Sequence, residues 1–344
     1  MRTYSSAFLV TALTVLLAAC SGGSSSPSTG SLTLNVTDSA INTTAISAVC
    51  VSFSSITVHY ASHPDVVVDY KPLPSQVTSL THCPVQGGWD GTGVWDGTGD
   101  VPPVRLNALG GTLTAALAES LQIPVGRVTW IRLQFTGNSY VLDSAGGTYD
   151  LQCPSCDVTD NNGGRGFKLN RTFQVTSSGL ALTVDIDLLK SLHQDSSGYV
   201  LRPTARIEPD DTIGTIAGTV DSSVITQLNG MTYDGSTIET GCAAYIFPGA
   251  SVTPDDYYDG SPVYSTARVR YDMTTDPSAP SYRYAAGALP AGMYTVAITC
   301  SPDDPMTDNS NTAGDPNAVV FTAGQDADVV AGQTAAVDFP PASP

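Results

Sequence analysis

The chain has 344 residues, and 32 acidic side chains outnumber 14 basic ones to give a formal net charge of −18. This length suffices for two domains with separate cores. The negative charge excludes electrostatic attraction to nucleic acid or to anionic lipid headgroups, and it is compatible with binding of divalent cations. The 32 glycines and 23 prolines, together with few long helical patterns, predict an all-β protein rich in turns.

The N-terminus predicts a secretory signal peptide over residues 1–19. Arg2 supplies the positive end, and the apolar run of residues 7–17 is shorter than the roughly 20 residues that span a bilayer. LAAC at residues 17–20 looks like a bacterial lipobox, in which Cys20 is lipidated and begins the mature chain. The alternative is ordinary signal cleavage that leaves a free cysteine.

A lipid on Cys20 predicts a lipoprotein of the bacterial cell envelope. Acyl chains such as palmitate and diacylglycerol hold a protein firmly, since each buried methylene contributes about 0.8 kcal/mol. Ser21, rather than an aspartate, follows the cysteine. In enteric-type bacteria this favours the outer membrane. The sequence does not decide whether the protein faces the periplasm or the cell surface. Residues 20–30 predict a flexible Gly/Ser tether.

Residues 31–209 predict a first domain, a β-sandwich with two short helices at its edges. Alternating apolar residues indicate strands at residues 32–36, 51–58, 66–68 and 128–135, with an irregularity near Ser54 and Ser55. Leu117 and Leu121 lie four residues apart and indicate one helix within residues 110–122. Residues 188–192 indicate the other helix.

Residues 179–207 predict two strands with oppositely charged wet faces. Asp185 and Asp187 share one face of the first strand, and Arg202 and Arg206 share one face of the second. If the strands are neighbours, we expect exposed cross-strand ion pairs, each contributing a fraction of a kcal/mol. The alternative is an anion site built on the two arginines, although they lack a glycine-rich loop or a helix N-terminus.

Five segments of this region carry a resemblance to a known family: GSLTLNVTDSA, VSFSSITVHY, IPVGRVTWIRLQF, DIDLLKSL and YVLRPTARI. Over about residues 30–209, the chain resembles the lipoprotein family known as domain of unknown function 4382. That family has no established activity. The resemblance therefore implies a location and a type of architecture, and it implies no reaction.

Residues 212–339 predict a second domain of short strands at 216–220, 243–247, 268–271, 288–296 and 335–339, with residues 340–344 as a tail. The opening IAGTV and the later LPAGMYTV resemble carboxypeptidase regulatory-like, or transthyretin-like, domains. This resemblance implies a seven-stranded, non-catalytic module. The whole chain is therefore expected to be all-β, with two β-sandwich domains of immunoglobulin or transthyretin type.

Six cysteines remain besides Cys20, and an even number in an exported protein suggests disulfides. We expect the pairs Cys50–Cys83, Cys153–Cys156 and Cys242–Cys300, although six cysteines allow about fifteen pairings. CPSC at residues 153–156 has the spacing of a redox motif. No thioredoxin-like βαβ pattern surrounds it, which favours a local structural disulfide.

Three histidines lie near the first cysteine pair in the sequence, His59, His63 and His82. Their side chains suit zinc or copper. No HxH or HExxH spacing supports such a site, so we expect exposed loop histidines instead.

The most distinctive motif is WDGTG, which occurs at residues 89–93 and 95–99 and precedes Asp100. Asp90, Asp96 and Asp100 offer oxygen ligands to calcium, and Trp89 and Trp95 offer flat faces for a sugar or a protein. The loop lacks the Asp-x-Asp-x-Asp-Gly run of a calcium-binding hand. A duplicated turn with each tryptophan folded back on the sheet is therefore favoured. Acid-rich loops at residues 157–163 and 303–315 are expected to face water.

Motifs for catalysis are absent from the sequence: there is no GxSxG elbow, no nucleophile–histidine–acid spacing, no phosphate loop and no dinucleotide fingerprint. We therefore expect a non-catalytic envelope lipoprotein for adhesion, scaffolding or binding of a protein or carbohydrate, without nucleic acid and without a cofactor other than calcium. One alternative is a calcium-dependent binding module. Another is a hydrolase, which requires two inward carboxylates about 5 to 10 Å apart.

Overall fold

The computed structural model describes residues 28–41, 43–157, 165–196, 198–232, 239–258, 262–272, 281–303 and 318–341. Strands predominate in these residues, and the only α-helices among them are three short ones, so the predicted all-β fold is confirmed. None of the described helices is long and apolar enough to cross a membrane. The signal peptide, Cys20 and most of the tether lie outside the described residues.

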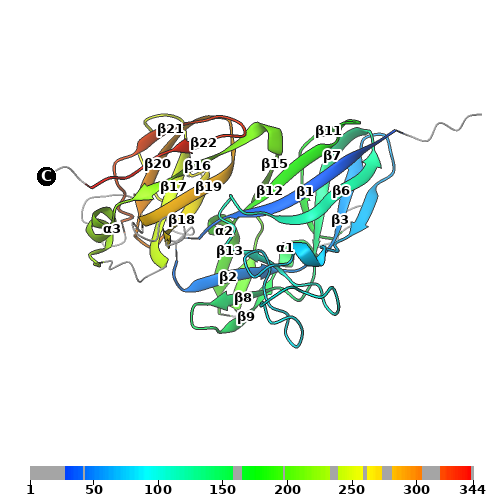
Figure 1. Cartoon of the computed structure of the whole chain (residues 1–344), viewed down its shortest axis with the longest axis horizontal. Helices are drawn as coiled ribbons and strands as arrows, with labels where there is room; N and C mark the ends of the chain where they lie inside the picture. Colours follow the sequence, from blue (N-terminus) through cyan, green and yellow to red (C-terminus); the bar gives the residue numbers. More distant parts are fainter. Residues whose placement is uncertain are drawn as a thin grey trace, which may run out of the picture.

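The first sheet is organised around the long strand β1 (Thr29–Ser39), which is blue in Figure 1. Its order is β15 (Ala205–Pro209), β12 (Leu180–Asp187), β1 and β6 (Ala115–Pro124). Strand β1 runs parallel to β12 and antiparallel to β6. This parallel pair brings the start of the domain beside its end.

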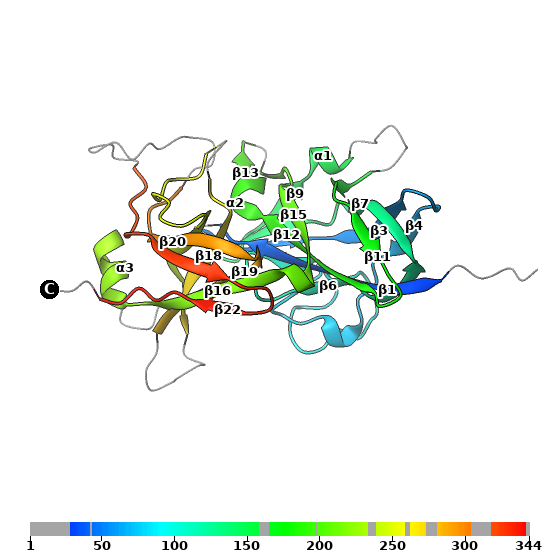
Figure 2. The same cartoon turned by 90° about the horizontal axis from the view of Figure 1, so that it is seen from above.

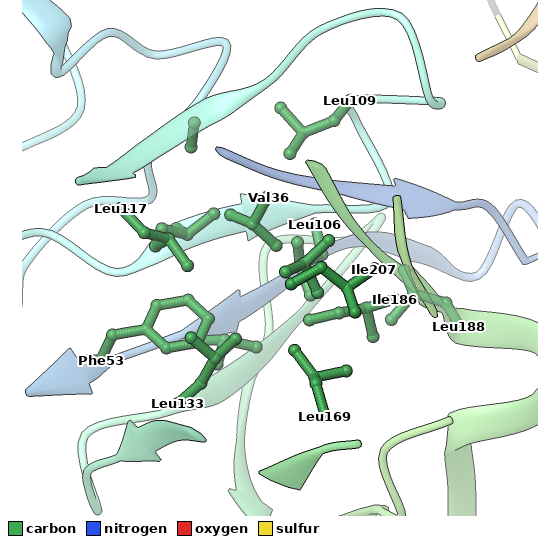
Figure 3. Packing of buried hydrophobic residues seen from close by; sticks show 14 of the residues in the cluster. Val36, Phe53, Leu106, Leu109, Leu117, Leu133, Leu169, Ile186, Leu188 and Ile207 are labelled. Atoms are coloured by element: carbon green, nitrogen blue, oxygen red, sulfur yellow. The ribbon is translucent and has the colours of Figure 1, made fainter. Parts of the chain in front are cut away.

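The second sheet covers the apolar face of the first. Its order is β10 (Phe167–Leu169), β7 (Gly126–Phe135), β3 (Phe53–Tyr60) and β4 (Val66–Asp69), and β11 (Phe173–Val175) also pairs with β7. Alternate side chains of both sheets point into one core. Figure 3 shows Val36 and Ile186 of the first sheet in one cluster with Phe53, Leu133 and Leu169 of the second.

A third sheet lies at one end of this sandwich. Its order is β13 (Leu192–Asp195), β14 (Gly198–Leu201), β9 (Thr148–Gln152), β8 (Tyr140–Asp143), β2 (Ile46–Val51) and β5 (Val104–Leu106). The chain leaves β2 at Ser52 and enters β3 of the second sheet, with a register shift between Phe53 and Ser55. The predicted irregularity near Ser54 and Ser55 is thus confirmed, and it marks a change of sheet.

One of the two predicted helices is correct. Residues 188–192 contain α2 (Leu188–Ser191), where the Asp187 side chain accepts a hydrogen bond from the Lys190 backbone N–H. The helix predicted within residues 110–122 is wrong, because Ala115–Pro124 pairs with β1 as strand β6 and buries Leu117. A register shift in β6 breaks the alternation of its apolar residues, which hides the strand in the sequence. The other short helices are α1 (Pro154–Asp157), η1 (Pro74–Gln76) and η2 (Asp210–Thr212).

The C-terminal part forms one seven-stranded sheet at the other end of the molecule (Figures 1 and 2). Its order is β21 (Gln325–Val329), β20 (Gly292–Thr299), β17 (Glu239–Pro248), β18 (Ser265–Asp272), β19 (Ser281–Pro290), β16 (Ile213–Val220) and β22 (Thr334–Ala336), with helix α3 (Ser222–Asn229) beside it. The edge strands β21 and β22 approach one another, so the sheet curls around its own core. The strand predicted at residues 288–296 is interrupted at Ala291, between β19 and β20.

Strand β17 is buried on both faces, which explains its unbroken apolar run. Cys242, Ala244 and Ile246 point into the C-terminal core. Tyr245 and Phe247 belong instead to the large core of the first part. The two parts of the chain therefore share apolar packing, whereas separate cores were expected.

Polar side chains are also buried where the two parts meet. Asp185 lies directly opposite Arg206 across β12 and β15 and forms an ion pair with it. The guanidinium of Arg206 also donates to the carbonyl of Tyr264 and lies 4.1 Å from the centre of that ring. The expected cross-strand pairing is correct for these two residues, whereas Asp187 contacts Lys190 at 3.0 Å instead. The expected exposure is wrong, because the C-terminal sheet covers this face and Asp185 is only 1% exposed. Arg202 lies at the surface, outside both strands.

Substitution of Arg206 tests the energetic cost of this burial. Removing one partner of a buried ion pair leaves an uncompensated charge and costs about 3–5 kcal/mol. We expect Arg206→Met to lower the free energy of unfolding in guanidinium by about this amount, and Arg202→Met to change it by less than about 0.5 kcal/mol. The double variant Asp185→Leu, Arg206→Met should recover most of the loss. Equal stability of Arg206→Met and Arg202→Met would contradict the buried pair.

Candidate functional site

The two WDGTG segments form two copies of one turn. In each copy, the aspartate Oδ1 accepts hydrogen bonds from the backbone N–H and the hydroxyl of the threonine two residues later, at 2.9 and 2.7 Å. Each indole N–H then donates to the carbonyl of that threonine, at 2.8 Å for Trp89 and 3.0 Å for Trp95. All four glycines have positive φ, which other residues rarely adopt. The structure thus has the expected duplicated turn, while the expected folding of each tryptophan back on the sheet stays a prediction.

The two tryptophans differ in exposure. Trp95 is buried, with 5% of its surface exposed, whereas Trp89 is half-buried. Only Trp89 therefore offers part of a flat face to a ligand. The hydroxyl of Thr92 holds the pKa of Asp90 below its usual range, and Thr98 does the same for Asp96.

The predicted calcium ligands are not gathered in one place. Asp90 and Asp96 each direct one carboxylate oxygen into their own turn. Among the residues that the structure describes, no group of three or more His, Cys, Asp or Glu side chains is placed to hold a metal ion. The third residue, Asp100, instead lines a cleft.

This cleft, which we call the polar cleft, measures 310 Å³. Asp100 enters it from the end of the WDGTG doublet, Asn138 and Ser139 from the turn before β8, and Asp150 from β9. Gln86, Tyr140 and Ser52 complete the hydrogen-bonding groups in its wall. None of its lining residues is basic.

The polar cleft lies where the chain passes from the third sheet to the second. The Ser52 N–H donates to the Ser139 hydroxyl at 3.0 Å, and the Ser52 hydroxyl donates to the Asn138 carbonyl at 3.1 Å. On the other wall, the Tyr140 hydroxyl donates to the carbonyl of Pro84 at 2.6 Å. The disulfide Cys50–Cys83 ties that wall to β2. These contacts hold Ser52, Ser139 and Tyr140 in place in the wall.

The chemistry of the polar cleft favours a ligand rich in hydrogen-bond donors. Asp100 and Asp150 carry carboxylates that only accept, and the amides of Asn138 and Gln86 both donate and accept. With two acids and no base in the lining, anions are disfavoured. Neutral hydroxyl or amide groups fit this set.

The structure contains all three predicted disulfides, Cys50–Cys83, Cys153–Cys156 and Cys242–Cys300. Cys153–Cys156 spans helix α1 and borders a second cleft of 420 Å³, which shares Gly137, Ser139 and Asp150 with the polar cleft. Cys156 is buried. These positions agree with a structural role for the local disulfide.

The three histidines have different surroundings and are not brought together as a metal site. His59 stacks on Trp130 at 4.4 Å between ring centres and contacts Asp65 at 2.6 Å. His63 meets the edge of Tyr60. The expectation of exposed loop histidines is wrong for His59, which is half-buried in β3, and for His82, which is 1% exposed and lies 3.0 Å from the Tyr70 hydroxyl.

Most residues of the two acid-rich loops lie outside the described residues. Asp157 is exposed, and the residues that follow it to 163 are not described. Asp303 is half-buried, where its Oδ2 accepts from the Tyr245 hydroxyl at 2.8 Å and from the Tyr257 N–H at 2.9 Å. This contact corrects the expectation of a wholly solvated loop, while Asp304, Asp308 and Asp315 lie outside the described residues.

The sequence analysis missed most of the polar cleft. Asn138, Asp150 and Gln86 stand far from Asp100 in the chain and form no motif with it. Only the pairing of β8 with β9 and the change of sheet at Ser52 bring them together. Turn residues at 136–139 were the only available signal.

Comparison with known proteins supports one of the two predicted resemblances. The family described as "Domain of unknown function (DUF4382)" matches residues 29–203. The chain belongs to this family. The predicted range of about 30–209 is therefore confirmed, while the carboxypeptidase regulatory-like resemblance of the C-terminal part stays a prediction.

Other comparisons are weaker. A crystal structure described as a "putative adhesin" from Bacteroides ovatus ATCC 8483 is similar to this DUF4382 protein with 10% identity and a TM-score of 0.21, over 93% of this chain and 95% of that chain. No curated protein matches the chain.

The pH dependence of stability tests the burial of His82. This residue precedes Cys83 in the segment that leads to the wall of the polar cleft. Burial lowers the pKa of His82 to about 4 from 6.5. His82 therefore binds a proton more tightly in the unfolded chain than in the folded protein. With respect to His82, the folded protein is most stable above pH 6.5, where this residue is neutral in both states, and it loses stability as the pH falls toward 4. We expect a contribution of about 3 kcal/mol at pH 7.

The measurement is the free energy of unfolding between pH 7 and pH 4 for the wild type, His82→Asn and the control His63→Asn. The slope with pH should become shallower in His82→Asn and stay unchanged in His63→Asn. Parallel slopes for all three proteins would show that His82 titrates normally in the folded protein.

Proposed function

We propose that this DUF4382 protein is a non-catalytic binding protein of the bacterial cell envelope, anchored by lipid on Cys20, which binds a neutral, hydroxyl-rich ligand in the polar cleft. The observation that carries the proposal is the lining of that cleft, in which carboxylates, amides and hydroxyls converge without a basic side chain. A carbohydrate is the ligand class that this chemistry fits best, and a polar loop of a partner protein is the second.

Carbohydrate recognition by the polar cleft rests on paired acceptors. A carboxylate accepts from two neighbouring hydroxyls, and charge-assisted hydrogen bonds are shorter and stronger than neutral ones. Tyr140 supplies an aromatic ring in the wall. The half-buried Trp89 is joined to the same wall, because its carbonyl accepts a hydrogen bond from the Val85 N–H at 2.7 Å. Rings of this kind provide apolar contact for the faces of sugars.

A hydrolase is the second candidate, because Asp100 and Asp150 line the same cleft. A general acid at neutral pH needs a carboxyl whose surroundings disfavour its charged form. Both side chains are exposed to water. The proposal therefore assigns them to binding, and the same sugar panel tests the alternative.

The lipid anchor is tested in cells. We expect radiolabelled palmitate to be incorporated into the wild-type protein and the protein to sediment with membranes, since a thioether-linked diacylglycerol and an amide-linked chain give stable anchoring. Cys20→Ser should abolish both the label and the membrane association. A soluble, unlabelled wild-type protein would remove the anchor from the proposal and leave the cleft untouched.

Binding is tested by calorimetry on the chain from residue 21 with maltose, cellobiose, lactose and chitobiose. We expect at least one disaccharide to bind, and Asp100→Ala or Asn138→Ala to raise its Kd about tenfold or more, since a hydrogen bond to a charged group is worth about 1.5–3 kcal/mol. Asp69→Ala, an exposed acid on β4, serves as the matched control and should leave the Kd unchanged.

Each titration is repeated with calcium and with chelator. A Kd that depends on calcium would favour the calcium-dependent module, and release of monosaccharide would favour the hydrolase. Absence of binding to every disaccharide in both conditions would overturn the carbohydrate proposal.

A further inference from the structure

A third cleft of 370 Å³, which we call the arginine cleft, lies where the two parts of the chain meet. One wall is formed by residues 107–113, between β5 and β6, and the other by β16, β18 and β19 of the C-terminal sheet. Three of its lining side chains are Arg268, Arg270 and Arg283, with Asp272 as the acid among them. Three of the 14 basic residues in a chain of net charge −18 thus surround one cavity.

The strand register places these cations on one face of the sheet. Arg268 and Arg270 are two residues apart on β18 and therefore point to the same side. Arg283 on β19 is the direct cross-strand partner of Arg270. Like charges in directly opposite positions destabilise a sheet unless negative charge lies between or beside them.

Among the described residues, two acids contact these arginines directly. Glu239 contacts Arg268 at 2.7 Å and Arg270 at 3.0 Å, and Asp272 lies 3.5 Å from Arg283. Among the described residues, a third acid lies near Arg283: hydrogen bonds from Thr219 lower the pKa of Asp338, and the charge of Arg283 lowers it further. A fourth arginine, Arg105, has its pKa lowered by burial and by the charge of Arg270. Asp38 lies behind the wall, where burial raises its pKa to about 7 and the charge of Arg270 acts in the opposite direction.

Two guanidinium groups remain accessible at the mouth. The side chains of Arg270 and Arg283 are 36% and 40% exposed, whereas that of Arg268 is 8% exposed. Within the described residues, the hydrogen bond and ion pair of Arg283 both involve its Nε atom, to Ser281 and Asp272. Its two Nη atoms, which form the fork that matches a carboxylate or phosphate, are not used in those contacts.

The cleft is held in shape from both sides. Asn107 accepts from the Ile41 N–H and donates to the Ile46 carbonyl, and its own carbonyl accepts from Arg270 at 3.2 Å. Gly111 and Gly287 bring the two walls into backbone contact, since a Cβ on Gly111 would lie 2.4 Å from the Gly287 nitrogen. Small residues, Ala217, Gly218 and Ala285, leave room along the floor.

We propose that the arginine cleft binds a small organic anion through a carboxylate or phosphate group held by Arg270 and Arg283, with the body of the ligand on the small residues of the floor. Arg268, which contacts Glu239, adds to the positive field. The site is separate from the polar cleft, which lacks basic residues.

Calorimetry on the chain from residue 21 tests the site with succinate and glycerol 1-phosphate, and with succinamide and glycerol as neutral counterparts. We expect one or both anions to bind at low salt and neither neutral compound to bind. Arg283→Gln should weaken binding at least tenfold without lowering the melting temperature, because it removes a like charge directly opposite Arg270. Arg127→Gln, an exposed arginine on β7 outside the cleft, is the matched control and should bind as the wild type does.

Glu239→Gln gives a result of opposite sign. It removes the internal carboxylate that competes for Arg270, so we expect the anion to bind several-fold more tightly. Succinate alone would identify a carboxylate ligand, and glycerol 1-phosphate alone a phosphate ligand, and either supports the site. Failure of both anions to bind, or equal loss in Arg283→Gln and Arg127→Gln, would overturn it.

Discussion

The buried contact between Asp185 and Arg206 determines how the two parts of this protein meet. Two charges removed from water must satisfy one another, and each must also find hydrogen-bond partners. Arg206 finds one in the Tyr264 carbonyl, and Asp185 accepts from Ser39, whose hydroxyl lies 2.7 Å from that of Ser265. Partners thus come from both parts of the chain. Another alignment of the parts would leave these groups buried without partners, so we infer that the pair selects one docking geometry.

Apolar packing supplies the stabilisation that such a pair does not. Strand β17 sends Tyr245 and Phe247 into the core of the first part, and burial of a large side chain contributes about 1.5–3 kcal/mol. Lys190 adds a contact across the same surface, to the Val263 carbonyl at 2.7 Å. The joint is therefore both apolar and specific, and the arginine cleft at its margin inherits a fixed shape. Both walls of that cleft depend on this docking.

The sequence predicted features that depend on local patterns and failed where distant segments decide. The alternation in residues 180–186 and 199–207 placed the acids and the arginines on matching faces, and the strand register then selects Asp185 and Arg206. It could not show that the pair is buried, because the covering residues Tyr264 and Ser265 come from the C-terminal sheet. Leu117 and Leu121 have helical spacing, yet pairing with β1 makes this segment a strand. The WDGTG turns were visible because all their hydrogen bonds are local.

The polar cleft and the arginine cleft have opposite electrostatic character, and the net charge of −18 affects ligand binding to each of them differently. A small anion is repelled at long range by the whole chain and attracted by the arginines only at short range. At physiological ionic strength, charges farther apart than about 8 Å are largely screened. The long-range repulsion is therefore weak there, while contact with Arg270 and Arg283 persists because the ligand touches them. A neutral ligand of the polar cleft experiences neither force. Added salt should therefore weaken the affinity of the arginine cleft for an anion, because the added ions compete for the guanidinium groups. The affinity of the polar cleft for a neutral ligand should stay nearly unchanged, because hydroxyl contacts are little affected by salt.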